Sequence, residues 1–109
     1  PKANIYIENQ LPNYALWKDF SERILVGTDS LASNDRLSIL DELIEIAVDS
    51  LDFDPTELVQ FACWNAARFF GWEAEFGAFE KGMKPGINLI TEAENGNPIG
   101  RGSTLIKIA

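Results

Sequence analysis

One short run of residues places a carboxylate where enzymes often carry out chemistry. The run is Gly27-Thr28-Asp29-Ser30, and it follows the apolar residues 24–26 directly. The segment Arg23 to Ser30 predicts a short strand that is buried on both faces, as in parallel sheets, and that Gly27 stops. In α/β sheets and barrels, catalytic groups gather at the C-terminal ends of strands. Asp29 is therefore a candidate catalytic carboxylate.

Two other interpretations of the same residues remain open. The side chains of Asp29, Ser30, Ser33 or Asn34 are of the types that cap the backbone N–H groups of a loop and of the helix that follows it. A phosphoryl-accepting aspartate is disfavoured, because the position two residues after Asp29, where a second carboxylate would assist Mg²⁺ binding, is Leu31.

Composition limits the chemistry and the partners. Histidine is absent, so any metal site built by these residues alone is carboxylate-only or incomplete. Nine Lys and Arg against seventeen Asp and Glu give a net charge of −8, which disfavours nucleic acid and anionic membranes as partners. No apolar run reaches the roughly 18 residues of a membrane span, and the sequence begins without a signal-peptide pattern.

The single cysteine, Cys63, cannot form an internal disulfide. This fits a reducing compartment, and we expect a cytoplasmic protein. Because no histidine is present to activate the thiol, we expect Cys63 to be a buried structural residue.

Three segments before Gly71 have helical patterns. A short helix is predicted over 12–20, a longer one over 37–51, and a third that starts with Asp54 as N-cap and ends at Gly71. The second helix carries a wide apolar stripe and a face of acidic residues that we expect to be solvated: Asp41, Glu42, Glu45 and Asp49. Beyond Gly77, residues 87–90 and 104–108 predict two strands joined by a turn-rich stretch.

Four ordered motifs together resemble the amidohydrolase superfamily, in its cytosine deaminase-like and chlorohydrolase-like branch. Gly27-Thr-Asp-Ser-Leu-Ala-Ser-Asn34 is similar to that family's eighth-strand motif, and Pro1-Lys-Ala-Asn4 to the segment after its seventh strand. Thr56 to Gly71, with Trp64-Asn-Ala-Ala67, is similar to the family's next helix, and Phe76-Gly-Ala-Phe-Glu-Lys-Gly82 to the turn that leaves the barrel. Two departures are Trp64, where Thr or Leu is usual, and residues 83–89, which lack the common aspartate.

The resemblance implies an α/β fold that is the C-terminal portion of a (β/α)8 TIM barrel followed by strands of a small β-sandwich. Residues 1–78 would belong to the barrel and 79–109 to the sandwich. A complete barrel takes about 250 residues, so the resemblance also implies that the 109 residues are a fragment of a longer chain.

The chemistry that the resemblance implies is hydrolysis of C–N or C–Cl bonds of a heterocyclic or amidine substrate by water activated on Zn²⁺ or Fe²⁺. Asp29 would be the catalytic residue and a metal ligand, and Asn4, Ser33 and Asn34 would contact substrate. We expect the fragment alone to hold no metal, because a catalytic site needs about three protein ligands, and to be inactive.

We also expect the fragment to self-associate through exposed apolar faces. The alternative to a partial enzyme is a self-contained small acidic α/β protein-interaction module that shares the strand-end aspartate. A module of that kind should fold cooperatively on its own and tolerate replacement of Asp29.

Overall fold

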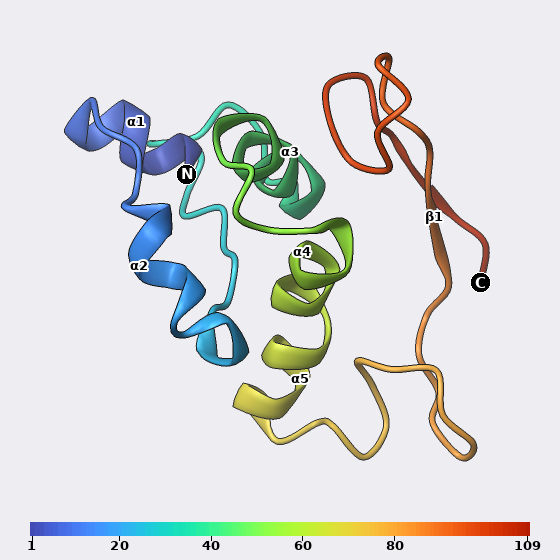
Figure 1. The fold of residues 1–109 in the computed structure, drawn as a ribbon. Coiled ribbons are helices and arrows are strands. Elements are labelled where there is room, and N and C mark those ends of the chain that lie inside the picture. Colours follow the sequence, from blue (N-terminus) through green and yellow to red (C-terminus); the bar gives the residue numbers. More distant parts are fainter.

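The computed structural model describes all 109 residues as a group of short helices beside a two-stranded ribbon (Figure 1). Helix α3 (Ile39–Asp49) begins after Ser38, whose hydroxyl accepts the Asp41 N–H at 3.2 Å. Helix α4 (Pro55–Ala62) begins at the capping box formed by Asp54 and Glu57. Both helices, and the short α2 (Tyr14–Lys18), lie within their predicted ranges.

The third predicted helix is divided in two. Helix α4 ends before Cys63, and α5 (Trp64–Phe70) follows at once and ends at Gly71. Cys63 has φ −113° and ψ −76°, which are not the dihedral angles of a continuous helix. The side chain of Cys63 is exposed, so the prediction of a buried cysteine was wrong. No helix in the structure has the length and apolar character needed to cross a membrane.

A helix that the sequence patterns did not predict forms at the start of the chain. Helix α1 (Lys2–Glu8) leads into α2 and the single 3-10 turn η1 (Ser21–Arg23). These elements lie on one side of the extended chain that follows them, with α3, α4 and α5 on the other (Figure 1).

The core lies mainly between α2, α3 and α4. Ile46 and Phe61 are fully buried there, and Phe53 meets Phe61 edge to face with ring centroids 5.3 Å apart. The buried cluster is formed by Tyr14, Leu40, Leu43, Ile46, Phe53, Leu58, Phe61 and Ile99. The apolar stripe predicted over 37–51 therefore supplies one side of this core.

The strand predicted at Arg23 to Ser30 does not form. The chain is extended at Ile24 and runs outside any helix as far as Ser30, but no backbone hydrogen bond pairs it with another strand, and Leu25 is exposed. A strand is defined by bonds to a neighbouring strand, and none lies beside this segment in the 109 residues. The predicted strand is therefore absent, because this segment belongs to no sheet.

The two strands predicted near the C-terminus do form. Strand β1 (Asn88–Ile90) pairs antiparallel with β2 (Leu105–Lys107), with Leu89 opposite Ile106. The loop between them carries Ile99 into the helical core, so the ribbon packs on the helices. These two strands are the whole sheet of this structure.

Candidate active site

Asp29 lies at the exposed end of the extended segment, in an unusual backbone conformation. Its φ is 57°, in the left-handed region that aspartate visits more readily than most residues because its short polar side chain bonds locally. This conformation turns the chain from the extended segment into the loop 30–37 that leads to α3.

A hydroxyl holds the Asp29 carboxylate. Ser33, which is buried, donates its Oγ–H to Asp29 Oδ2 at 2.7 Å and also lies 3.3 Å from the Ser30 carbonyl oxygen. No protein group donates to Asp29 Oδ1. One carboxylate oxygen is thus anchored and the other is free for an external group.

The end of the extended segment is fastened by a buried amide. Asn34 Nδ2 donates to the carbonyl oxygen of Thr28 at 2.9 Å and to Glu42 Oε1 at 2.6 Å, and its Oδ1 accepts the Arg36 N–H at 3.3 Å. Both amide hydrogens of Asn34 are therefore used inside the protein. The prediction that Asn34 contacts substrate stays a prediction.

A second buried amide fastens the beginning of the same segment. Asn65, at the start of α5, donates through Nδ2 to the carbonyl oxygens of Ser21 and Ile24, both at 2.8 Å, and is 3% exposed. Gln60 donates to Asn65 Oδ1 at 3.3 Å. Side-chain amides at both ends therefore fix an extended segment that has no β-sheet bonds.

The acidic face predicted on α3 is not uniformly solvated. Glu42 is fully buried, although Asp49 on the same helix is exposed, so the prediction was wrong for Glu42. The physical reason is that the loop after Asp29 folds back over this turn of α3 and brings Asn34 to the carboxylate. Charge patterning gave no signal of this, because a buried and a solvated glutamate look alike in a sequence.

A groove of about 520 Å³ lies between α1 and the loop after Asp29. Ser33 and Asn34 line it from the loop, and Ile5 lines it from α1, whereas Asp29 and Asn4 do not. Asn4 lies half-buried in α1, with no hydrogen bond to the loop residues. The structure brings three of the four predicted site residues together and leaves Asn4 apart.

Ion pairs join α1 to the loop. Lys2 Nζ lies 3.1 Å from Asp35 Oδ1 and 3.9 Å from Asp41 Oδ2, and Arg36 lies 3.6 Å from Asp41. The hydrogen bond from Lys2 holds the pKa of Asp35 below its ordinary value. The positive charges nearest the loop are therefore engaged by carboxylates other than Asp29.

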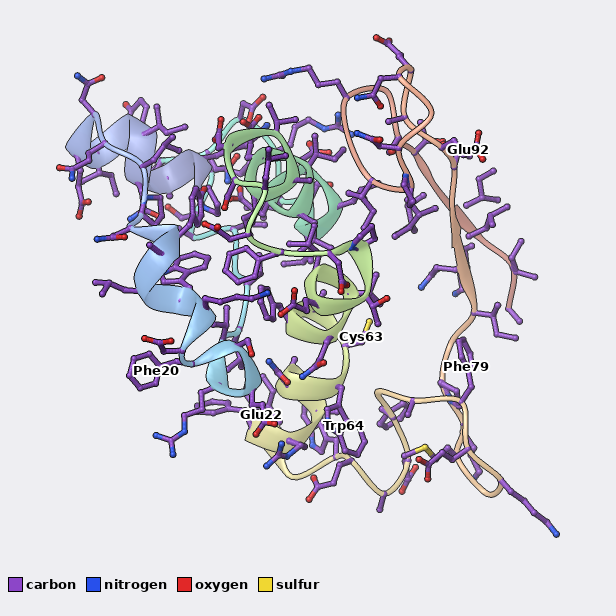
Figure 2. The ribbon with its side chains drawn as sticks, viewed as in Figure 1. Phe20, Glu22, Cys63, Trp64, Phe79 and Glu92 are labelled. Carbon is purple, nitrogen blue, oxygen red and sulfur yellow. The ribbon has the colours of Figure 1, made fainter.

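A second, apolar groove of about 490 Å³ lies between helices α4 and α5 and the chain at residues 76–88. Cys63 and Phe79 both line it, and Figure 2 shows Cys63 on the side of the helices that faces the ribbon. Although Cys63 is exposed, the apolar walls of the groove keep some water from its thiol, and this desolvation raises the pKa of the thiol and opposes formation of a nucleophilic thiolate. The structure offers no group that would reverse this effect, so Cys63 is not a catalytic candidate.

The carboxylates of the chain do not form the ligand set that a catalytic metal ion needs. No three His, Cys, Asp or Glu side chains converge as a metal-binding group. Asp29 fits the role of a single carboxylate ligand, because it is exposed and its Oδ1 is free while Ser33 orients the other oxygen. A catalytic zinc site uses about three protein ligands, so these residues do not form such a site by themselves.

Comparison with known proteins places the chain in a family. A sequence model of the amidohydrolase family matches residues 1–101, which include Asp29 and the buried asparagines that fasten its segment. No curated protein and no solved structure matches the chain. The match spans nearly the whole chain, and the chain belongs to the amidohydrolase family.

Proposed function

We propose that these residues are the C-terminal section of a metal-dependent amidohydrolase of the cytosine deaminase-like and chlorohydrolase-like branch. Membership in the family implies a TIM-barrel-type fold, a hydrolase and, in general, a divalent metal ion. The segment before Asp29 supports the proposal, because it lies outside any helix and no backbone hydrogen bond pairs it with a neighbouring strand. In this proposal the segment is the last strand of the barrel, and residues 79–109 belong to a small β-sandwich.

The observation that carries the proposal is the geometry of Asp29. The carboxylate stands at the end of the extended segment, and Ser33 fixes Oδ2 at 2.7 Å. A divalent metal ion in such an enzyme supplies an activated water nucleophile. Asp29 serves as one ligand, and its carboxylate also accepts and returns a proton during the reaction.

The proposed substrates are small heterocycles or cyclic amidines that carry an amino group or a chlorine on a ring carbon. Water replaces the substituent at that carbon, so the products are the hydroxylated or oxo ring with ammonia or chloride. Ser33 and Asn34 line the groove beside α1, which supports a role near substrate. A substrate contact by Asn4 stays a prediction. The proposed metal is zinc or iron.

The test uses the natural gene product that contains this sequence, loaded with Zn²⁺ or Fe²⁺. It is incubated with a panel of amino- and chloro-substituted heterocycles, and released ammonia and chloride are measured. Turnover of at least one class is expected, and Asp29→Asn should lower kcat/KM by about 10²–10⁴-fold, the usual contribution of a proton-transferring group. Asp49→Asn, an exposed change on α3, is the matched control. Equal rates for wild type and Asp29→Asn would exclude Asp29 from the chemistry.

The isolated 109-residue chain should show no turnover and retain no catalytic metal after dialysis, because it supplies one ligand. Metal retained at one equivalent would contradict this part of the proposal.

One observation favours the alternative of a self-contained interaction module. Ile99, from the loop between the strands, lies in the same core as the helices, so the two predicted parts share one core. A module would unfold cooperatively as the 109-residue chain and lose no function with Asp29→Asn, whereas the enzyme section would lose its rate.

A further inference from the structure

The carboxylate of Glu42 is fully buried in α3, which needs a physical reason. Removing a carboxylate from water is costly unless hydrogen-bond donors replace the lost water. Both oxygens of Glu42 have such donors. Oε1 accepts from Asn34 Nδ2 at 2.6 Å, and Oε2 accepts from the Lys2 backbone N–H at 3.0 Å.

The partner on Oε1 connects Glu42 to the candidate catalytic residue. The second hydrogen of the Asn34 amide goes to the carbonyl oxygen of Thr28 at 2.9 Å. That carbonyl belongs to the peptide unit between Thr28 and Asp29, so its orientation sets the plane from which the φ of Asp29 is measured. The φ of Asp29 is 57°, a conformation that needs support from its surroundings.

We propose that Glu42 is a positioning residue, which fixes the backbone of Asp29 through Asn34 and thereby aims the Asp29 carboxylate at the metal ion. This inference rests on the proposed function. Asn34 donates to two acceptors at once, and a charged acceptor on one side makes the shared amide group a stronger and more rigid connection. Ser33 then orients the side chain, while the Glu42–Asn34 pair orients the main chain.

Glu42 acts on the main chain and not on the substrate. It is fully buried and does not line the groove beside α1. Glutamine is the informative replacement, because it keeps the shape of the side chain but has one acceptor oxygen and one amide donor. In Glu42→Gln, an N–H group must face either Asn34 Nδ2 or the Lys2 N–H, so one of these bonds is lost.

The experiment uses the natural gene product and two readouts, kcat/KM and metal affinity measured by competition with a chelator. Glu42→Gln and Asn34→Ala should each weaken metal affinity or activity by about 10–100-fold, as is usual for groups that orient a metal ligand. If Glu42 acts through Asn34, the double variant should be no worse than the more damaged single variant. Asp49→Asn is the acid-to-amide control on the same helix and should change neither readout.

Measurements in the Asp29→Asn variant distinguish a positioning role of Glu42 from a purely structural one. There, Glu42→Gln should still lower the thermal unfolding midpoint but should cause no further loss of rate or metal affinity. A further loss equal to that in wild type would overturn the proposal. Asn34→Ala provides a second test in case Glu42→Gln does not fold, because it leaves the bond from Glu42 to α1 in place. Wild-type metal affinity and kcat/KM in folded Asn34→Ala would also overturn the proposal.

The outcomes separate this inference from the proposed function. If Asp29→Asn has the rate and metal affinity of wild type, the proposed function fails. If Asp29→Asn is impaired while Glu42→Gln and Asn34→Ala are not, the proposed function stands and the positioning role of Glu42 is excluded.

Discussion

Replacement of Asn65 should release the beginning of the extended segment that carries Asp29. The Asn65 amide donates to the carbonyl oxygens of Ser21 and Ile24, both at 2.8 Å. Each bond contributes about 0.5–1.5 kcal/mol net, and a buried carbonyl left without a donor adds to the loss. We therefore expect Asn65→Ala to lower the free energy of unfolding by about 2–4 kcal/mol.

A second substitution at the same position separates hydrogen bonding from loss of volume. Asn65→Asp has nearly the same shape as wild type, so it leaves no cavity, but it places carboxylate oxygens against two carbonyl oxygens. At neutral pH it should destabilise more than Asn65→Ala, because the buried charge loses its solvation and one carboxylate oxygen meets two carbonyl oxygens, while only Gln60 donates to the other. If packing alone explained Asn65, the alanine variant would be the worse of the two.

The assay is urea unfolding of the natural gene product, followed by circular dichroism at constant protein concentration and pH. Asn13→Ala is the matched control, since Asn13 is exposed and its side chain makes no capping bond. Unchanged unfolding for both Asn65 variants would refute the reasoning that side-chain amides hold this segment.

Four further predictions concern Tyr14, Cys63 and the exposed ribbon. The hydroxyl of Tyr14 is buried without a hydrogen-bond partner, so Tyr14→Phe should raise the free energy of unfolding by about 1 kcal/mol in urea titrations. Burial and the acidic residues Asp49, Glu45 and Glu42 raise the pKa of Tyr14. Above about pH 10 the unfolded state therefore loses a proton that the folded state keeps, so the free energy of unfolding should fall as the pH rises. This fall should be smaller in Tyr14→Phe. Cys63 should react with iodoacetamide at pH 7 more slowly than a cysteine in an unfolded peptide, because its thiol pKa is raised, and an equal rate would contradict this. The isolated chain should sediment as oligomers at micromolar concentration, because Leu89, Leu105 and Ile106 are exposed on the ribbon, and a sharp monomer boundary would disprove it.

Local signals in the sequence predicted much of the secondary structure. The Asp54 capping box, the stripe of α3 and the two C-terminal strands are each specified by residues close together in the chain, and all three form. The division at Cys63 was not predictable in this way, because apolar periodicity runs through it. The strand predicted at Arg23 to Ser30 failed for a different reason, since no backbone hydrogen bond pairs this segment with a neighbouring strand.

The candidate site was predictable in part. The position of Asp29 at the end of an apolar run made it the candidate, and the structure places the Ser33 hydroxyl on its carboxylate at 2.7 Å. Glu42 was missed, because its burial depends on a loop that folds back from a position eight residues earlier in the chain. The sequence also did not predict that Asn34 and Asn65 hold the segment before Asp29. Their amide groups donate to carbonyl oxygens whose positions are known only from the structure.

The central claim is that Asp29 is a metal ligand of a longer amidohydrolase, and metal content tests it most directly. The natural gene product and its Asp29→Asn and Asp49→Asn variants are dialysed against chelator-treated buffer, and bound zinc and iron are measured by mass spectrometry. We predict about one equivalent or more of metal in wild type and in Asp49→Asn, and a clear loss in Asp29→Asn. Equal metal content in all three proteins would contradict the claim.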